Sequence, residues 1–258
     1  MLGLVLGLAL ALGAVTAVQA TETQPAPCPT ARANAPLEPP PTPPMPTAEP
    51  ETGGADYRHL LKPTAAGWPV RDHWCIWVEP VAAEAGTAAA VRDQQWQRAV
   101  AAALHSWSTL LSLTEVSSPE QAQIRLWRRR PPLQPLADGR NRASNGRAVL
   151  HLLRVDRGSG WQAEPRVEVL LSPGRPERAM QATALHELGH AFGLWAHSDR
   201  PNDAMAATPG GVPVLELSPR DRGTLQWLLR QSGRLQTPPG PVQTPAAAPE
   251  PPQAPKAD

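Results

Sequence analysis

Alternating apolar and polar positions mark several segments in the middle of the chain as β-strands. The run HWCIWV at 73–78 is rich in aromatic and β-branched residues, and QIRLW at 123–127 alternates in the same way. Two further strands are expected at 148–155 and 166–171, with a glycine-rich turn at 158–160 between them. Together these segments predict one β-sheet.

A helical period of apolar residues runs from Thr87 to Leu111. The residues that form it fall at spacings of four, four, three and four: Trp96, Val100, Leu104, Trp107 and Leu111. This spacing predicts a single long helix with one buried face. A second helix is expected from near Pro176 to about Leu194.

The last helix has well-defined boundary signals. Ser218 is expected as its N-cap, Pro219 occupies the first helical position, Asp221 lies in the first turn and Gly233 follows the end. Its core-facing residues are expected to be Leu225, Leu228 and Leu229. The order of strands and helices indicates α+β or α/β, one sheet with a few helices against it, and we predict an α+β fold.

The two ends of the chain differ from its middle. Residues 1–20 are apolar and uncharged and end in the small residues expected before a signal-peptidase cleavage site, which predicts an export signal; a retained membrane anchor is the alternative. Prolines are frequent in 21–55 and again in 234–258, and both segments are predicted to be disordered because they lack apolar periodicity. The folded domain is therefore expected at 56–233.

Composition limits the partners that the protein can have. A formal net charge of +1 over 258 residues gives no electrostatic reason to expect nucleic acid. Cys75 is most simply a buried thiol, although it could pair with Cys28 in an oxidising compartment. The arginine run at 128–130 favours a solvated strand end over an anion site.

The segment HELGH at 186–190 has the spacing of a metal site on a helix. His186 and His190 are four residues apart and share one helix face, about 6 Å apart at their stems, so both imidazoles can bind one zinc ion. Glu187 cannot join them in the first shell, but it can reach a water on the metal and take its proton. This arrangement is typical of metal-assisted hydrolysis.

A third protein ligand is expected just downstream. Gly193 can adopt a left-handed conformation, end the helix and turn the chain back toward the metal. His197 then lies within reach as the third imidazole, and the fourth coordination position stays open for water and substrate.

The segment from Thr183 to Ser198, followed by Pro201–Met205, resembles the zinc-binding region of the metzincin metalloproteases. It is most similar to that of the matrixins and their bacterial matrixin-like relatives. The family places a methionine in a tight turn beneath the zinc, and Met205 stands at that place. Ser218–Asp221 also resembles the start of the family's last helix. The resemblance implies a metzincin-like α+β fold: a twisted mixed sheet with a long upper helix, and an active-site helix, Met-turn and C-terminal helix below the cleft.

The chain departs from the family signature HExxHxxGxxH at the third ligand. Ala196 stands where the family has histidine, and His197 comes one position late. A one-residue bulge at Trp195–Ala196 could restore the geometry, with Asp199 or Asp203 as weaker substitutes for the ligand.

Other residues receive plainer interpretations. Tyr57, the only tyrosine, lies far upstream, so an astacin-like tyrosine ligand is absent. Cys28 could occupy the zinc as matrixin pro-segments do, but it lacks the surrounding pattern. Isolated histidines that are expected to be ordinary surface or core residues are His59, His73, His105 and His151.

These observations predict a secreted or cell-envelope zinc endopeptidase that acts on a protein or peptide substrate. The metal ligands would be His186, His190 and His197, and Glu187 would activate the zinc-bound water and pass its proton to the leaving amine. We expect the substrate to lie along a sheet edge formed by 166–171, with 206–214 as the wall of a side-chain pocket.

Two other functions remain open. One is a non-catalytic module at the cell envelope in which zinc only stabilises a binding or structural domain. The other is a metal hydrolase that acts on a bond other than a peptide. We expect the protein to be a monomer with no stable membrane span once the signal is removed.

Overall fold

The computed structural model describes residues 28–37, 54–81, 84–136 and 139–235. The predicted export signal and nearly all of the C-terminal proline-rich tail lie outside the described residues. Among the described helices, none combines the length and the apolar character that a membrane span requires.

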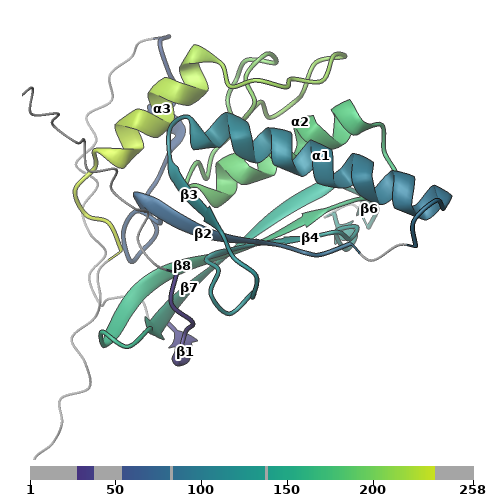
Figure 1. Ribbon diagram of the computed structural model, residues 1–258. Helices are drawn as coiled ribbons and strands as arrows, with labels where there is room; N and C mark the ends of the chain where they lie inside the picture. Colours follow the sequence, from purple (N-terminus) through teal and green to yellow (C-terminus); the bar gives the residue numbers. More distant parts are fainter. Residues whose placement is uncertain (1–27, 38–53, 82–83, 137–138, 236–258) are drawn as a thin grey trace, which may run out of the picture.

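The fold is α+β and is built on a six-stranded mixed sheet in the order β1-β7-β8-β4-β2-β3 (Figure 1). Its strands are β1 (Ala33–Pro36), β2 (His73–Val78), β3 (Ser112–Glu115), β4 (Ile124–Trp127), β7 (Gly146–Asp156) and β8 (Trp161–Leu171). The strands β2, β3, β4 and β8 are mutually parallel, whereas β7 is antiparallel to both of its neighbours. A short separate hairpin joins β5 (Gln134–Pro135) to β6 (Asn141–Arg142).

The four predicted strands are all present, and two of them are longer than expected. β7 and β8 each span 11 residues and pair along their whole length. The turn between them contains Gly158 and Gly160, both with positive φ (+103° and +93°), a conformation that suits glycine. This turn lets the two strands continue as one hairpin beyond their apolar segments.

In the described part of the chain, three α-helices accompany the sheet: α1 (Ala88–Ser108), α2 (Glu177–Ala191) and α3 (Pro219–Leu229), together with the 3-10 turn η1 (Arg58–Leu60). α1 and α2 pack side by side on one face of the sheet (Figure 1). The predicted face of α1 is buried at Trp96, Val100 and Trp107. α1 begins after Thr87, whose hydroxyl accepts a hydrogen bond from the Ala90 N–H at 3.1 Å.

The boundary signals of α3 are confirmed. The Ser218 hydroxyl accepts from the Asp221 N–H, and the Asp221 carboxylate accepts from the Ser218 N–H, so the two residues form a reciprocal capping box. Leu225 and Leu228 are fully buried in the core, and Leu229 packs against it while partly exposed.

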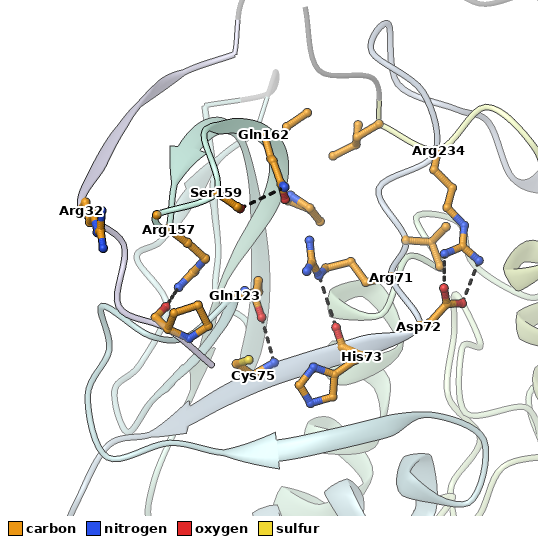
Figure 2. A pocket seen from close by; sticks show the side chains of 16 residues that line it. Arg32, Arg71, Asp72, His73, Cys75, Gln123, Arg157, Ser159, Gln162 and Arg234 are labelled. Carbon is orange, nitrogen blue, oxygen red and sulfur yellow. Dashed lines mark hydrogen bonds and ion pairs between the residues drawn. The ribbon is translucent and has the colours of Figure 1, made fainter. Parts of the chain in front are cut away.

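The two faces of β2 have different neighbours. Trp74 and Ile76 point into the hydrophobic core beneath the helices. Because strand residues alternate, His73 and Cys75 point to the opposite face of the sheet, where they line a cavity beside the β7–β8 hairpin (Figure 2).

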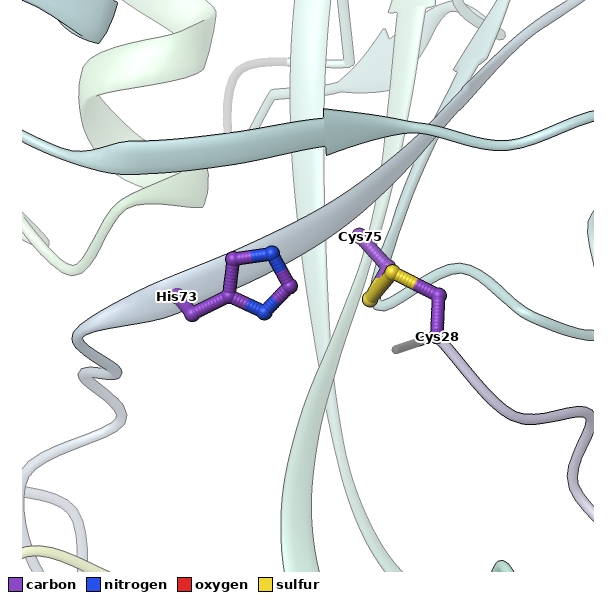
Figure 3. Close-up of side chains that lie close together, drawn as sticks. All are labelled: Cys28, His73 and Cys75. Atoms are coloured by element: carbon purple, nitrogen blue, oxygen red, sulfur yellow. A yellow bond between two sulfur atoms is a disulfide. The ribbon is translucent and has the colours of Figure 1, made fainter. Parts of the chain in front are cut away.

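Residues 28–37 belong to the folded domain, which corrects the expected disorder of this part of the proline-rich segment. β1 pairs with the end of β7, and Cys28 forms a disulfide with Cys75 (Figure 3). The disulfide also decides between the two interpretations of Cys75, which is not a free thiol. Composition alone missed this attachment because it depends on a covalent bond and a strand pairing to distant residues.

We expect removal of the disulfide in the double variant Cys28→Ser/Cys75→Ser to lower the free energy of unfolding by about 2–4 kcal/mol. The bond closes a loop between residues 47 positions apart, so its loss releases considerable chain entropy in the unfolded state. Urea unfolding under oxidising and reducing conditions measures this effect. The double variant should show no dependence on reductant, and an equal response of both proteins to reductant would contradict the assignment.

The arginine run after β4 is only partly solvated. Arg128 forms an ion pair with the buried Asp93 on α1, and its backbone N–H donates to Glu79 at 2.6 Å. Arg129 lies over the ring of Trp127, 4.3 Å from its centroid, and is largely exposed. The prediction of a solvated strand end therefore fails for Arg128, which joins β4 to α1.

Candidate metal centre

α2 places the first two histidines and the glutamate of the predicted site. His186 and His190 lie one turn apart on the helix, with their ring centroids 4.9 Å apart. His190 is buried, whereas His186 and Glu187 are half-buried. All three line a cavity of about 720 Å³.

Gly193 ends the helix as predicted. It has φ of +112°, and the Leu194 N–H donates to the Gly189 carbonyl at 2.9 Å, which closes the last turn. A Cβ at position 193 would also lie 3.0 Å from the Leu228 side chain, so both the backbone conformation and the limited space favour glycine here.

His197 joins the other two histidines despite its shifted position. Its Nε2 lies 3.2 Å from the Nε2 of His190, and its ring stacks on that of His186 at 5.2 Å. After the helix, the Trp195 N–H donates to the Gly193 carbonyl at 2.9 Å in a tight bend that accommodates the extra residue. The ligand atoms of the three rings all lie within 4.8 Å of one another.

The alternative ligands are directed elsewhere. Asp199 and Asp203 both form ion pairs with Arg220, each at 2.8 Å. Arg220 is itself buried and also donates to the Ser198 hydroxyl at 3.1 Å. The two aspartates therefore fix the loop after His197 to α3, and neither approaches as a third ligand.

Backbone carbonyls orient two of the imidazole rings. The Nδ1 of His186 is 2.8 Å from the Ala204 carbonyl oxygen, and the Nδ1 of His190 is 2.7 Å from that of Leu194. A carbonyl can only accept, so Nδ1 carries the proton in both rings and Nε2 presents its lone pair. This is the tautomer that a metal ligand requires.

The three rings fit a tetrahedral divalent metal ion. Metal–nitrogen bonds of about 2.0–2.1 Å in tetrahedral geometry separate the nitrogens by about 3.3–3.4 Å, close to the 3.2 Å between His190 and His197. Burial and the neighbouring His186 lower the pKa of His190 to about 3, and burial lowers the pKa values of His186 and His197. The rings are therefore neutral at pH 7, and their lone pairs are free to bind a metal.

Met205 lies directly beneath α2. It is fully buried, and a Cβ added at Gly189 would come within 2.2 Å of its sulfur. The turn that contains Met205 is closed by hydrogen bonds between Ser198 and Met205 (2.7 Å) and between Ala207 and Ser198 (3.0 Å). This turn supports the helix from below and presents the Ala204 carbonyl to His186.

Asp221 connects this turn to α3 and to Tyr57, the residue before η1. Its carboxylate accepts hydrogen bonds from the Ala204 N–H at 2.8 Å and from the Tyr57 hydroxyl at 2.8 Å, in addition to its capping bonds. Tyr57 therefore has a structural role, as expected for a tyrosine that is not a ligand. Beyond the capping box, this network could not be predicted from the sequence, because most of the groups that donate to Asp221 are backbone N–H groups.

Glu187 is held in a poorly solvated position beside the histidines. Burial raises its pKa to about 7, and a backbone hydrogen bond at Ala148 and the charge of Arg147 partly oppose that rise. The side chain lines the same cavity as the three histidines.

The sheet edge beside the cavity is not the one expected from sequence. β8, which contains 166–171, lies between β7 and β4, so the prediction that it forms a free edge is wrong. The edge is formed by β7, which pairs with β1 only over Leu153–Asp156. Within the described part of the chain, no strand pairs with the outer edge of 146–151, and the start of this segment lines the cavity.

The segment 206–214 lines the cavity, as predicted. The residues of this segment that line it are Ala206, Ala207, Pro209, Gly210, Gly211, Pro213 and Val214. Gln134 and Arg142, from the separate hairpin β5–β6, add polar groups to the lining. The metal centre therefore lies between a strand edge and a loop.

Gly146 allows β7 to approach α2 closely. A Cβ at this position would lie 2.5 Å from the Thr183 methyl and 2.7 Å from the Glu187 Cγ. We expect Gly146→Ala to lower the free energy of unfolding by about 1–3 kcal/mol because one of these side chains or the strand must move. Gly211→Ala is the matched control in the same cavity, where an added Cβ meets nothing within 4 Å. Equal unfolding midpoints for the two variants would contradict this close approach.

The four isolated histidines lie apart from the centre. His73 bonds to Thr114 at 2.9 Å and lies near the Cys28–Cys75 disulfide, the only other metal-type grouping among the described residues (Figure 3). Both sulfurs of that grouping are already joined covalently.

Comparisons with known proteins add no relative: no family model matches the chain, and no curated protein is significantly similar to it in sequence.

Proposed function

We propose that the protein is a zinc-dependent endopeptidase with a metzincin-like catalytic domain, exported to the cell envelope or beyond. The observation that supports this most directly is the convergence of three neutral imidazoles beside the half-buried carboxylate of Glu187, in one cavity. The order of long helix, active-site helix, methionine turn and capped last helix also agrees with the resemblance seen in the sequence. The disulfide favours an oxidising compartment.

Each part of the cavity has a role in this proposal. His186, His190 and His197 would hold the ion, and bound zinc would polarise the peptide carbonyl and activate water as a nucleophile. Glu187 would accept the proton of the attacking water and return it to the nitrogen of the leaving amine. The free edge of β7 would pair with an extended peptide, and the 206–214 wall would contact a side chain next to the cleaved bond.

A combined metal and cleavage assay tests the proposal. We expect the purified full chain to contain close to one zinc per molecule, and to cleave a fluorogenic peptide library. A strong chelator should abolish cleavage, and added Zn²⁺ should restore it. Bound zinc without cleavage of any peptide would instead favour the non-catalytic zinc-stabilised module. Cleavage that survives complete removal of metal would contradict both.

A further inference from the structure

A second cavity, of about 740 Å³, lies on the face of the sheet opposite α1 and α2 (Figure 2). Several parts of the chain that are distant in sequence supply most of its lining: 29–32, 70–75, 157–165 and 234–235. It shares no lining residue with the metal cavity. Its volume is in the range of small-molecule binding sites.

Arginine dominates the charge of this second cavity. Four arginines line it, against one carboxylate, Asp72. Asp72 is already engaged by Arg234 at 2.5 and 2.8 Å, and Arg157 is engaged by Glu164 at 2.9 Å. The other two arginines of the lining are Arg32 and Arg71. The cavity therefore has an excess of positive charge.

Arg71 is the more buried of the two lining arginines that have no ion pair with a described residue. It is half-buried, and among the described residues it forms no ion pair. Its guanidinium donates through Nε to the His73 carbonyl oxygen at 3.3 Å, which leaves the outer part of the fork for another acceptor (Figure 2). Burial lowers the pKa of Arg71, and the charges of Arg157 and Arg234 act in the same direction, while the charges of Glu164 and Asp72 oppose them.

We propose that this cavity binds a small acidic ligand through an oxyanion group, phosphate or carboxylate, held by Arg71. A guanidinium presents parallel N–H donors that match both groups, and an anion here would balance the excess positive charge of the lining. Ser159 and Gln162 lie in the same lining and add neutral hydrogen-bonding groups. The proposal does not depend on the peptidase function, because the two cavities lie on opposite faces of the sheet.

Titration of the full chain with inorganic phosphate and with succinate, at constant ionic strength set by chloride, tests the proposal. We expect saturable shifts of backbone amide resonances at 71–73 and 157–162, and the tighter of the two probes identifies the class of anion. Arg71→Met should weaken binding by at least about tenfold, because it removes a charged donor pair and retains an apolar stem. Arg92→Met, at an exposed position on α1, is the matched control and should bind as the parent does.

Two results would overturn the proposal. One is that neither phosphate nor succinate produces saturable amide shifts at 71–73 and 157–162 beyond the shifts that chloride alone produces. The other is equal affinity in Arg71→Met and Arg92→Met. The resonance map of the unmodified chain decides the location even if Arg71→Met does not fold.

Discussion

Replacement of Glu187 by glutamine is expected to reduce peptide cleavage by about 10²–10⁴-fold while the zinc content stays unchanged. The amide has nearly the same shape as the carboxylate and can still accept a hydrogen bond at Ala148, but it cannot take a proton. His186, the residue before it, and His190, nearly one turn further along α2, keep their rings and their carbonyl partners. The loss should therefore fall on kcat rather than on folding or metal affinity.

Glu177→Gln is the matched control for this variant. Glu177 lies in the first turn of the same helix and forms an exposed ion pair with Arg98 at 2.8 Å, far from the metal cavity. Because water and salt screen this exposed pair, its loss should leave both stability and cleavage nearly unchanged. If Glu187→Gln cleaves peptides as fast as Glu177→Gln does, Glu187 is not the proton acceptor.

The same pair of variants separates the endopeptidase from its rival. A zinc-stabilised binding module would lose nothing with Glu187→Gln, since the carboxylate is not expected to be a metal ligand. In that case the substitution would change only the free energy of unfolding. Burial raises the pKa of Glu187 and so disfavours its charged form, and glutamine carries no charge to bury. Kinetics and unfolding measured on one preparation therefore distinguish the two functions.

Local sequence patterns predicted the α-helices and four of the strands that the structure describes, but not β1, β3 or the β5–β6 hairpin. The period of apolar residues in α1 and the capping signals of α3 act within a few residues, and the structure places both as expected. The spacing of His186 and His190 is equally local, because four residues on a helix bring two side chains to one face. Even the shifted third ligand could be expected, since Gly193 permits the turn that returns His197 to the site.

Long-range pairing was the part that the sequence did not show. Alternation in 166–171 indicates a strand but not its neighbours. The structure places β8 in the middle of the sheet rather than at an edge, and Glu168 forms an ion pair with Arg125 of the adjacent strand β4 at 3.3 Å. The attachment of residues 28–37 was missed for the same reason, because its disulfide and strand partners are distant in sequence.

The carbonyls that orient the histidines could not be predicted at all. Ala204 and Leu194 contribute only backbone oxygens, so their side chains give no signal of the role. Their positions depend on the methionine turn and on the bend after Gly193, which are set by packing and by Asp221.

Of the variants considered, His197→Ala should have the largest effect on zinc affinity. We expect His197→Ala to weaken zinc binding by more than about a hundredfold, because only two protein ligands remain and a tight site needs three. Replacing a residue that merely hydrogen-bonds to a ligand already lowers metal affinity by about 10–100-fold, so the loss of a ligand should cost more. His197 is exposed, so its removal leaves no buried cavity, and the fold should persist. Competition against a chromophoric chelator measures the affinity, and circular dichroism verifies the fold.

Two further variants make this test specific to the third ligand. His151→Ala removes an exposed histidine on β7 and should leave zinc affinity unchanged. His197→Cys should recover much of the affinity, since a thiolate is also a zinc ligand at this position. Unaltered affinity in His197→Ala would show that another residue is the third ligand, and Asp199→Ala would then lose zinc. We expect the opposite result, in which Asp199→Ala keeps its zinc, because Asp199 forms an ion pair with Arg220 at 2.8 Å and is not a ligand.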